Sequence, residues 1–165
     1  MNAFSLSLMY NHARGEDMDL IVKDALALSC FDNSQLLAGK TGVYNVVSDV
    51  IVMEAHDVEV WLKPGQMVLS SLYSLKGSSR HEFKAFIHKL KDLGASAIVV
   101  KMGRFVNELS SGIIEGCDQY DLPLVLIDET VAYRDIILKV MQTLINKKAN
   151  MLDIYQTVHH EFKEL

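Results

Sequence analysis

The sequence predicts an α/β fold: a mostly parallel sheet with flanking helices, followed by a long C-terminal helix. From residue 66 onward, short apolar runs alternate with amphipathic stretches in the order strand, helix, strand, helix, strand, helix. This order is typical of parallel sheets with right-handed crossovers. The final segment then keeps an unbroken helical period that contains no proline or glycine.

The part before residue 66 predicts smaller elements. Apolar residues from Asp19 to Phe31 have helical spacing, and Asp19 is a candidate N-cap. Gln35 to Ala38 has the character of a short strand, closed by Gly39. Val43 to Glu54 is rich in valine and isoleucine, which favours one interrupted strand or two successive strands.

Three strands and two helices are expected next. Continuous apolar runs predict strands that are covered on both faces, while a serine before a run and a glycine after it mark the ends of a helix. The expected elements are a strand from Gln66 to Leu72, a helix from Ser78 or Ser79 to Leu93, a strand from Ala95 to Met102, a helix from Arg104 or Phe105 to Tyr120, and a strand from Leu122 to Ile127.

In the C-terminal segment, apolar residues recur at alternating steps of four and three, which is the spacing of a coiled-coil seam. The seam positions are Ile137, Met141, Leu144, Lys148, Met151, Tyr155, Val158, Phe162 and Leu165. A helix over the last 35 residues or so extends roughly 50 Å at about 1.5 Å per residue, farther than a domain of this size covers. We therefore expect a dimerisation stalk or a connector to a further domain; the alternative is a helix folded back on its own domain. The residues expected at a homodimer interface are Leu144, Met151, Tyr155, Val158 and Phe162.

These patterns divide the chain into three parts. Residues 1–17 are expected to be an N-terminal tail, with Met18 as a candidate natural start. Residues 18–130 form the α/β domain, and residues 131–165 form the connector or dimerisation helix.

Composition narrows the function classes. The net charge is −5, and no lysine-rich or arginine-rich block is present, which argues against a nucleic-acid surface within this chain. Cys30 and Cys117 lie far apart without metal-ligand spacing, so we expect reduced thiols in a cytoplasmic protein. No apolar run approaches the roughly 18 residues that span a bilayer. We expect no metal, no cofactor and no membrane partner.

Polar side chains follow the predicted strands. In open parallel sheets, ligands bind beyond the carboxyl ends of the strands, and a lysine beside the start of a helix favours an anion there. The candidate ligand-binding residues are Ser70, Ser71, Lys101, Gly103, Arg104 and Asp128. The alternative is that Lys101 pairs with Asp128 or Glu129 across the sheet edge while Arg104 is solvated.

The other motifs give weaker evidence of function. Gly39-Lys40-Thr41 is similar to the end of a phosphate-binding loop, but Ser34 stands where that loop requires a glycine. The acidic stretch from Glu54 to Glu59 has no second cluster at metal-ligand spacing, and is interpreted as a solvated loop. No serine, cysteine or lysine has a neighbouring base that marks it as a nucleophile. Catalysis is therefore not expected.

Four segments carry a family pattern: Asp24 to Leu28, Leu36 to Gly39, Trp61 to Ser71, and Val99 to Arg104. In this order and spacing, over about residues 19 to 142, they resemble the N-terminal sensory domain of purine-catabolism regulator (PucR-type) bacterial transcription factors. Family members carry an acid and a glycine where this chain has Gln66 and Leu72, whereas the hydroxyl pair remains as Ser70 and Ser71.

The resemblance implies a homodimeric domain that senses a nitrogen-rich metabolite and passes its state to a downstream DNA-binding domain. No ligand-binding residue is taken from the family. Two other readings stay open. Lys63-Pro64-Gly65-Gln66 and the stretch from Leu93 to Val100 are similar to the nucleotide-sugar-binding domain of muramyl ligases. The domain is alternatively a ligand-free oligomerisation module.

Overall fold

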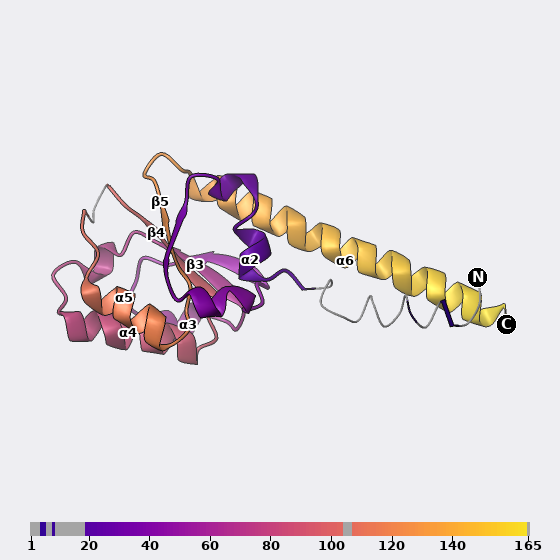
Figure 1. The fold of residues 1–165 in the computed structure, drawn as a ribbon, viewed down its shortest axis with the longest axis horizontal. Coiled ribbons are helices and arrows are strands. Elements are labelled where there is room, and N and C mark those ends of the chain that lie inside the picture. The colour runs from indigo at the N-terminus through magenta and orange to yellow at the C-terminus, as the bar shows by residue number, and fades with distance from the viewer. Residues whose placement is uncertain (1–3, 6–7, 9–18, 104–106, 165) are drawn as a thin grey trace.

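The computed structural model describes residues 4–5, 8, 19–103 and 107–164, and its sheet lies between two layers of helices (Figure 1). The strand order is β1-β5-β4-β3-β2. Strands β2 to β5 run parallel to one another, and β1 pairs antiparallel with β5 at one edge. The strands are β1 (Gln35–Ala38), β2 (Asp49–Val52), β3 (Gln66–Ser70), β4 (Ala97–Lys101) and β5 (Leu124–Ile127). The expected α/β class with a mostly parallel sheet is confirmed.

One face of the sheet is covered by the crossover helices α3 (Val58–Trp61), α4 (Arg80–Asp92) and α5 (Ser111–Gln119). Its core includes Ile98 from the sheet, Ile87 from α4 and Ile113 from α5, all fully buried. The Ser79 side chain accepts a hydrogen bond from the Glu82 N–H, and the Glu82 carboxylate accepts one from the Ser79 N–H. This capping box begins α4 where the sequence predicts it.

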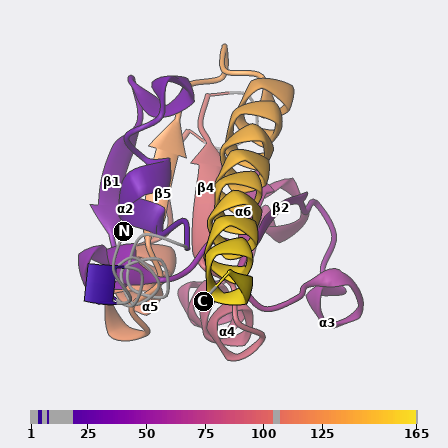
Figure 2. The same ribbon diagram turned by 90° about the vertical axis from the view of Figure 1, so that its right-hand side faces the viewer.

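The opposite face is covered by α2 (Val22–Ala25), the short 3-10 helix η1 (Ser29–Phe31) and the first half of α6 (Tyr133–Lys163). In Figure 2, α6 passes in front of β4, with α2 on one side and β2 on the other. Ile136 and Val140 of α6 are fully buried against this face, and Leu144 is nearly so. The second half of α6 projects beyond the domain (Figure 1).

Two predicted helices are shorter in the structure. The expected helix from Asp19 to Phe31 is divided into α2 and η1, because Leu28 is extended and the N-cap is Ile21 rather than Asp19. Ile21 also bridges to Val46, so tertiary pairing fixes this start. The expected helix from Arg104 or Phe105 begins at Ser111 instead, where the Ser110 hydroxyl accepts from the Gly112 N–H; residues 104–106 lie outside the described part, as does most of the predicted tail.

The segment predicted as one or two strands from Val43 to Glu54 is also different. It begins within a 3-10 helix, η2 (Lys40–Tyr44), and only β2 is a strand.

Of the two thiols, Cys117 is fully buried and burial raises its pKa to about 12, whereas Cys30 is only partly buried. The other predicted strands and the long helix are present, each within a few residues of its expected bounds.

Candidate functional site

The carboxyl ends of β4 and β5 form a switch point in the sheet. The chain leaves β4 toward α5 on one face, whereas it leaves β5 toward α6 on the other. Connections that diverge to opposite faces open space between neighbouring strand ends, which is where open α/β sheets bind ligands. Lys101, the last residue of β4, stands at this point and pairs in register with Ile127 of β5.

Lys101 is held over an aromatic ring. Its Nζ lies 4.2 Å from the centre of the Tyr133 ring, a cation–π contact. Tyr133 is the first residue of α6. Among the described residues, Lys101 forms no ion pair with Asp128 or Glu129, contrary to the expected alternative. The contact joins the end of the central strand β4 to the start of the long helix.

Glu54 and Ser71 form a second polar contact at the same edge of the sheet. The Ser71 N–H donates to one oxygen of the Glu54 carboxylate at 2.9 Å, and the Ser71 hydroxyl donates to the other at 2.7 Å. Glu54 lies just beyond β2 and Ser71 just beyond β3, which are paired parallel strands. Both oxygens of this carboxylate are therefore engaged.

The Tyr133 hydroxyl lies close to both contacts. It is shielded from solvent and makes no hydrogen bond of ordinary geometry to a described residue, but the Glu54 carboxylate is near enough to interact with it as an acceptor. Burial raises the Tyr133 pKa, and the negative charge of Glu54 and the hydrogen-bonding interaction with its carboxylate raise it further, so the hydroxyl stays protonated. A buried donor that is poorly hydrogen-bonded is uncommon in native proteins and costs free energy. We call Glu54, Ser71, Lys101 and Tyr133 the strand-end cluster.

Leu72 follows this cluster in an unusual backbone conformation. It is fully buried but has a φ of 57°, in the left-handed region that β-carbon sterics disfavour. The N–H of Leu72 donates to the Ser70 hydroxyl at 3.0 Å, which holds the turn that places Ser71 against Glu54. This is the position at which the resembling family carries glycine.

We expect Leu72→Gly to be more stable than Leu72→Ala, the reverse of the usual order. Both lose a buried side chain, a loss of about 2–5 kcal/mol, but glycine also relieves about 1–2 kcal/mol of left-handed strain. Chemical unfolding of both variants measures the order. Leu69→Gly and Leu69→Ala in β3 are the control pair, for which alanine should be the more stable. The same order at both positions would mean that residue 72 is unstrained.

The remaining candidate ligand-binding residues that the structure describes do not join the strand-end cluster. Asp128 is exposed and accepts hydrogen bonds from the N–H and hydroxyl of Thr130, which lower its pKa; it therefore stabilises a local turn. Gly103 has a φ of 106° and lies against the Glu129 side chain. Arg104 lies outside the described residues. Ser70 is buried, and its hydroxyl accepts a hydrogen bond from the Leu72 N–H.

Two residues of the cluster were missed at the level of sequence. Glu54 was grouped with its acidic neighbours as a loop, although it follows β2 as Ser71 follows β3. Applying the strand-end rule to that strand as well would have found it. Tyr133 carries no comparable signal, because its role depends on the face of α6 that packs on the sheet.

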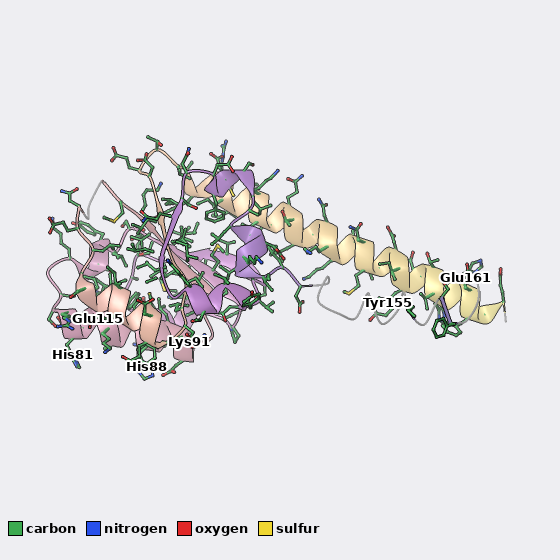
Figure 3. The ribbon with its side chains drawn as sticks, viewed as in Figure 1. His81, His88, Lys91, Glu115, Tyr155 and Glu161 are labelled. Carbon is green, nitrogen blue, oxygen red and sulfur yellow. The ribbon has the colours of Figure 1, made fainter. Side chains whose placement is uncertain are left out.

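The five residues expected at a dimer interface do not share one environment. Leu144 is buried in the sheet-facing core and Val158 is covered within the chain, whereas Met151 is half-buried. Tyr155 and Phe162 are exposed, and Figure 3 shows Tyr155 on the part of α6 beyond the domain. The dimer interface itself stays a prediction.

A metal-binding cluster and a membrane-spanning helix are both absent from the described residues. No group of three or more histidine, cysteine, aspartate or glutamate residues is placed to hold a metal ion within the described part of the chain. Across the same residues, no helix combines the length and apolar character needed to cross a membrane.

The chain is similar to known proteins over most of its length. Residues 24–144 match the purine catabolism regulatory protein-like family. The chain is similar to the purine catabolism regulatory protein of Bacillus subtilis (strain 168), with 25% identity over 141 residues. The alignment covers 86% of this chain but only 26% of that relative, so the chain spans about a quarter of the relative's length. The matched region includes every strand and the sheet-facing half of α6.

Proposed function

Because the chain belongs to the purine catabolism regulatory protein-like family, we propose that it is the metabolite-sensing domain of a transcriptional regulator. In this proposal, an effector binds at the strand-end cluster, and α6 couples that event to a DNA-binding domain elsewhere in the regulator. The protein acts as a cytoplasmic homodimer without catalysis. The relative is named as a regulatory protein and is much longer than this chain, which supports a regulatory role for this chain as one part of such a protein.

The observation that carries the proposal is the buried, poorly hydrogen-bonded Tyr133 hydroxyl beside Lys101 at the switch point; its neighbouring acceptor, the Glu54 carboxylate, already accepts both Ser71 donors. A ligand that offers an acceptor to the hydroxyl and negative charge to the ammonium would satisfy both groups. Carboxylates and the carbonyl-rich edges of nitrogen heterocycles have this chemistry. Since Tyr133 begins α6, a ligand at the cluster contacts the start of the coupling helix directly.

The test is a thermal-shift panel of the chain against purines, ureides, amino acids, dicarboxylates and nucleotide-sugars. A ligand at about 100 times its Kd adds about 2.7 kcal/mol to the free energy of unfolding, which raises Tm by roughly 5–10 °C for a domain of this size. We expect one chemical class to raise Tm in a dose-dependent way, and the rise to be lost in Lys101→Gln and reduced in Tyr133→Phe.

Lys40→Gln is the matched control, because Lys40 follows β1 at the opposite edge of the sheet and is exposed. It removes the same charge and should retain the full response. A response that survives Lys101→Gln would place the ligand away from the cluster. A nucleotide-sugar response would favour the nucleotide-sugar-binding module instead.

A ligand-free oligomerisation module is the second candidate. The observation in its favour is that Lys101 already rests on the Tyr133 ring and Glu54 already binds both Ser71 donors, so the cluster largely satisfies itself. In that case no compound of the panel changes Tm, and Tyr133→Phe stabilises the domain because it removes a buried hydroxyl that is poorly hydrogen-bonded.

A further inference from the structure

The outer side of α6 carries large apolar residues that face solvent at heptad spacing. Leu138, Ile145 and Leu152 follow one another at intervals of seven and are 60%, 62% and 58% exposed. Steps of three and four join them to further residues, of which Met141 is half-buried and also packs against the sheet-facing core. We call this set the outer stripe: Leu138, Met141, Ile145, Lys148, Leu152, Tyr155, His159 and Phe162.

The outer stripe begins on the side of α6 turned away from the sheet. Val140, fully buried, is two residues from Leu138 and thus about 200° around the helix. The domain therefore uses one apolar side of α6 for its own core and leaves Leu138, Ile145 and Leu152 exposed on the other. Large apolar residues repeated every seven positions are the pattern by which one helix packs on another.

We propose that the outer stripe binds the outer stripe of a second copy of this chain, with the two α6 helices antiparallel. The proposal rests on the homodimer of the proposed function, and is independent of whether a metabolite binds. A second copy is the occupant because the stripe complements itself: an antiparallel pair matches each aliphatic position with an aromatic or long side chain. Leu138 packs opposite Phe162 of the second copy, Ile145 opposite its Tyr155, and Leu152 opposite its Lys148.

Charge selects this orientation. In a parallel pair, Lys148 of one copy would face Lys148 of the other in the same layer, which places like charges together inside the seam. The antiparallel pair separates the two Lys148 side chains and places each beside the Leu152 side chain of the other copy. It also brings Asp135 of one copy beside Lys163 of the other at both ends of the seam. Both residues are exposed, so the pair contributes little affinity but favours one orientation.

The residues flanking the stripe also suit close approach. Between the Asp135–Lys163 pairs at its two ends, Gln142 comes opposite Gln156 of the second copy and Ala149 opposite its Ala149, so no charged side chain stands between the helices in the middle of this flank. Asp135 lies two residues from Tyr133. The end of one subunit's helix therefore arrives next to the strand-end cluster of the other subunit.

Sedimentation of the chain over a concentration series tests the interface. The wild type is expected to be a dimer, and Leu138→Asp with Ile145→Asp should weaken association at least ~100-fold, since each carboxylate would be buried against an aromatic side chain of the partner, Phe162 or Tyr155, without a counter-charge. The control is Asn150→Asp with Thr157→Asp, which adds the same charge on a different side of α6 and should remain dimeric. All four positions are exposed, so circular dichroism and Tm should report folded proteins.

Disulfide formation tests the orientation, in chains that carry Cys30→Ser so that only the buried Cys117 remains. Ile145→Cys and Tyr155→Cys should each fail to cross-link alone but cross-link when mixed. In the antiparallel pair, residue 145 of one copy lies about 15 Å from residue 145 of the other, beyond the roughly 7 Å that a disulfide spans. Cross-linking of either variant with itself would show a parallel pair and overturn the orientation.

The remaining outcomes separate this proposal from ligand sensing. A monomeric wild type, or a dimer that Leu138→Asp with Ile145→Asp leaves intact, would overturn the outer stripe as an interface. Neither result changes the thermal-shift response of the strand-end cluster, which is measured independently. A dimer with no ligand response would retain this inference and favour the oligomerisation module.

Discussion

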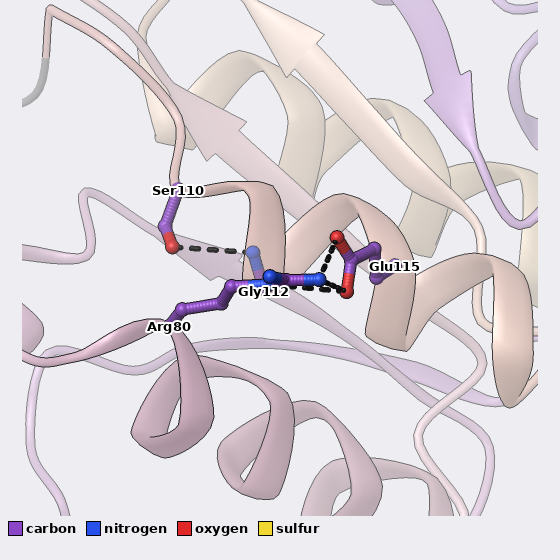
Figure 4. A network of polar contacts seen from close by, with 4 residues as sticks. All are labelled: Arg80, Ser110, Gly112 and Glu115. Atoms are coloured by element: carbon purple, nitrogen blue, oxygen red, sulfur yellow. Dashed lines mark hydrogen bonds and ion pairs between the residues drawn. The ribbon is translucent and has the colours of Figure 1, made fainter.

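Gly112→Ala is expected to destabilise the domain by about 3 kcal/mol or more, although alanine normally stabilises a helix by about 1 kcal/mol relative to glycine. Gly112 is in the first turn of α5, which crosses the start of α4 there (Figure 4). A β-carbon at this position would lie 2.9 Å from the carbonyl carbon of Arg80 and still closer to its oxygen. Because the obstacle is backbone, no rotamer change relieves it and one helix must move.

The local polar contacts cannot hold the two helices together against this overlap. Arg80 forms an ion pair with Glu115 at 2.6 Å across the same junction, but both side chains are exposed, and such pairs contribute about 0–1 kcal/mol. The Ser110 cap depends on the N–H of Gly112 itself, at 3.2 Å. Displacement of α5 therefore also weakens its first turn.

Denaturant unfolding of four variants isolates the cause. Gly77→Ala has no atom within 4 Å of the new β-carbon but a φ of 85°, so it should lose only about 1 kcal/mol from backbone strain. Glu115→Ala should lose less than about 1 kcal/mol. Gly116→Ala, whose β-carbon meets the β-carbon of Ile87 at 3.1 Å, should fall between Gly77→Ala and Gly112→Ala, because a side chain rather than backbone must shift. If Gly112→Ala is as stable as Gly77→Ala, the close helix crossing is not as described.

The central part of the fold could be predicted from the sequence because its signals are local and agree with one another. β3 and β4 are continuous apolar runs, and residues 97–100 of β4 are wholly buried in the structure. α4 has a serine and a glutamate three residues apart at its start and Gly94, with φ 88°, just after its end. Capping and burial thus identified the same boundaries.

Boundaries that depend on tertiary pairing could not be predicted in this way. The start of α2 is set by the bridge from Ile21 to Val46, two residues that are distant in sequence. In the candidate site, the strand-end rule located Ser71 and Lys101 but not their partners. Glu54 reaches Ser71 because β2 and β3 pair in parallel, and that register is not visible in either segment alone.

The orientation of α6 is the largest gap between sequence and structure. The helix has apolar residues on more than one side, and the heptad rule by itself does not say which side the sheet takes. The predicted seam runs between the two stripes that the structure distinguishes: Leu144 belongs to the sheet-facing side, and Tyr155 and Phe162 remain exposed. Packing of the domain, rather than the local sequence pattern, decides which side of α6 contacts the sheet.

Val140→Asp is expected to be the most destabilising change in α6, with a loss of more than about 4 kcal/mol at neutral pH. Val140 is fully buried in the sheet-facing core with Ile136 and Leu144. A carboxylate there loses its hydration and finds no counter-charge, which is among the most costly of single substitutions. The adjacent exposed change, Lys139→Asp, alters the charge more but should lose less than about 1 kcal/mol.

The pH dependence distinguishes this cause from a general packing defect. Burial raises the pKa of an aspartate introduced at residue 140 above its value of about 3.9 in the unfolded chain. The folded state then binds a proton more readily than the unfolded state, so the stability gap between Val140→Asp and the wild type should narrow as pH falls from 7 toward 4. Val140→Ala, which has no titratable group, should show a constant gap. Equal losses for Val140→Asp and Lys139→Asp would mean that the first half of α6 does not pack on the sheet, and would remove the physical link between Tyr133 at the strand-end cluster and the outer stripe.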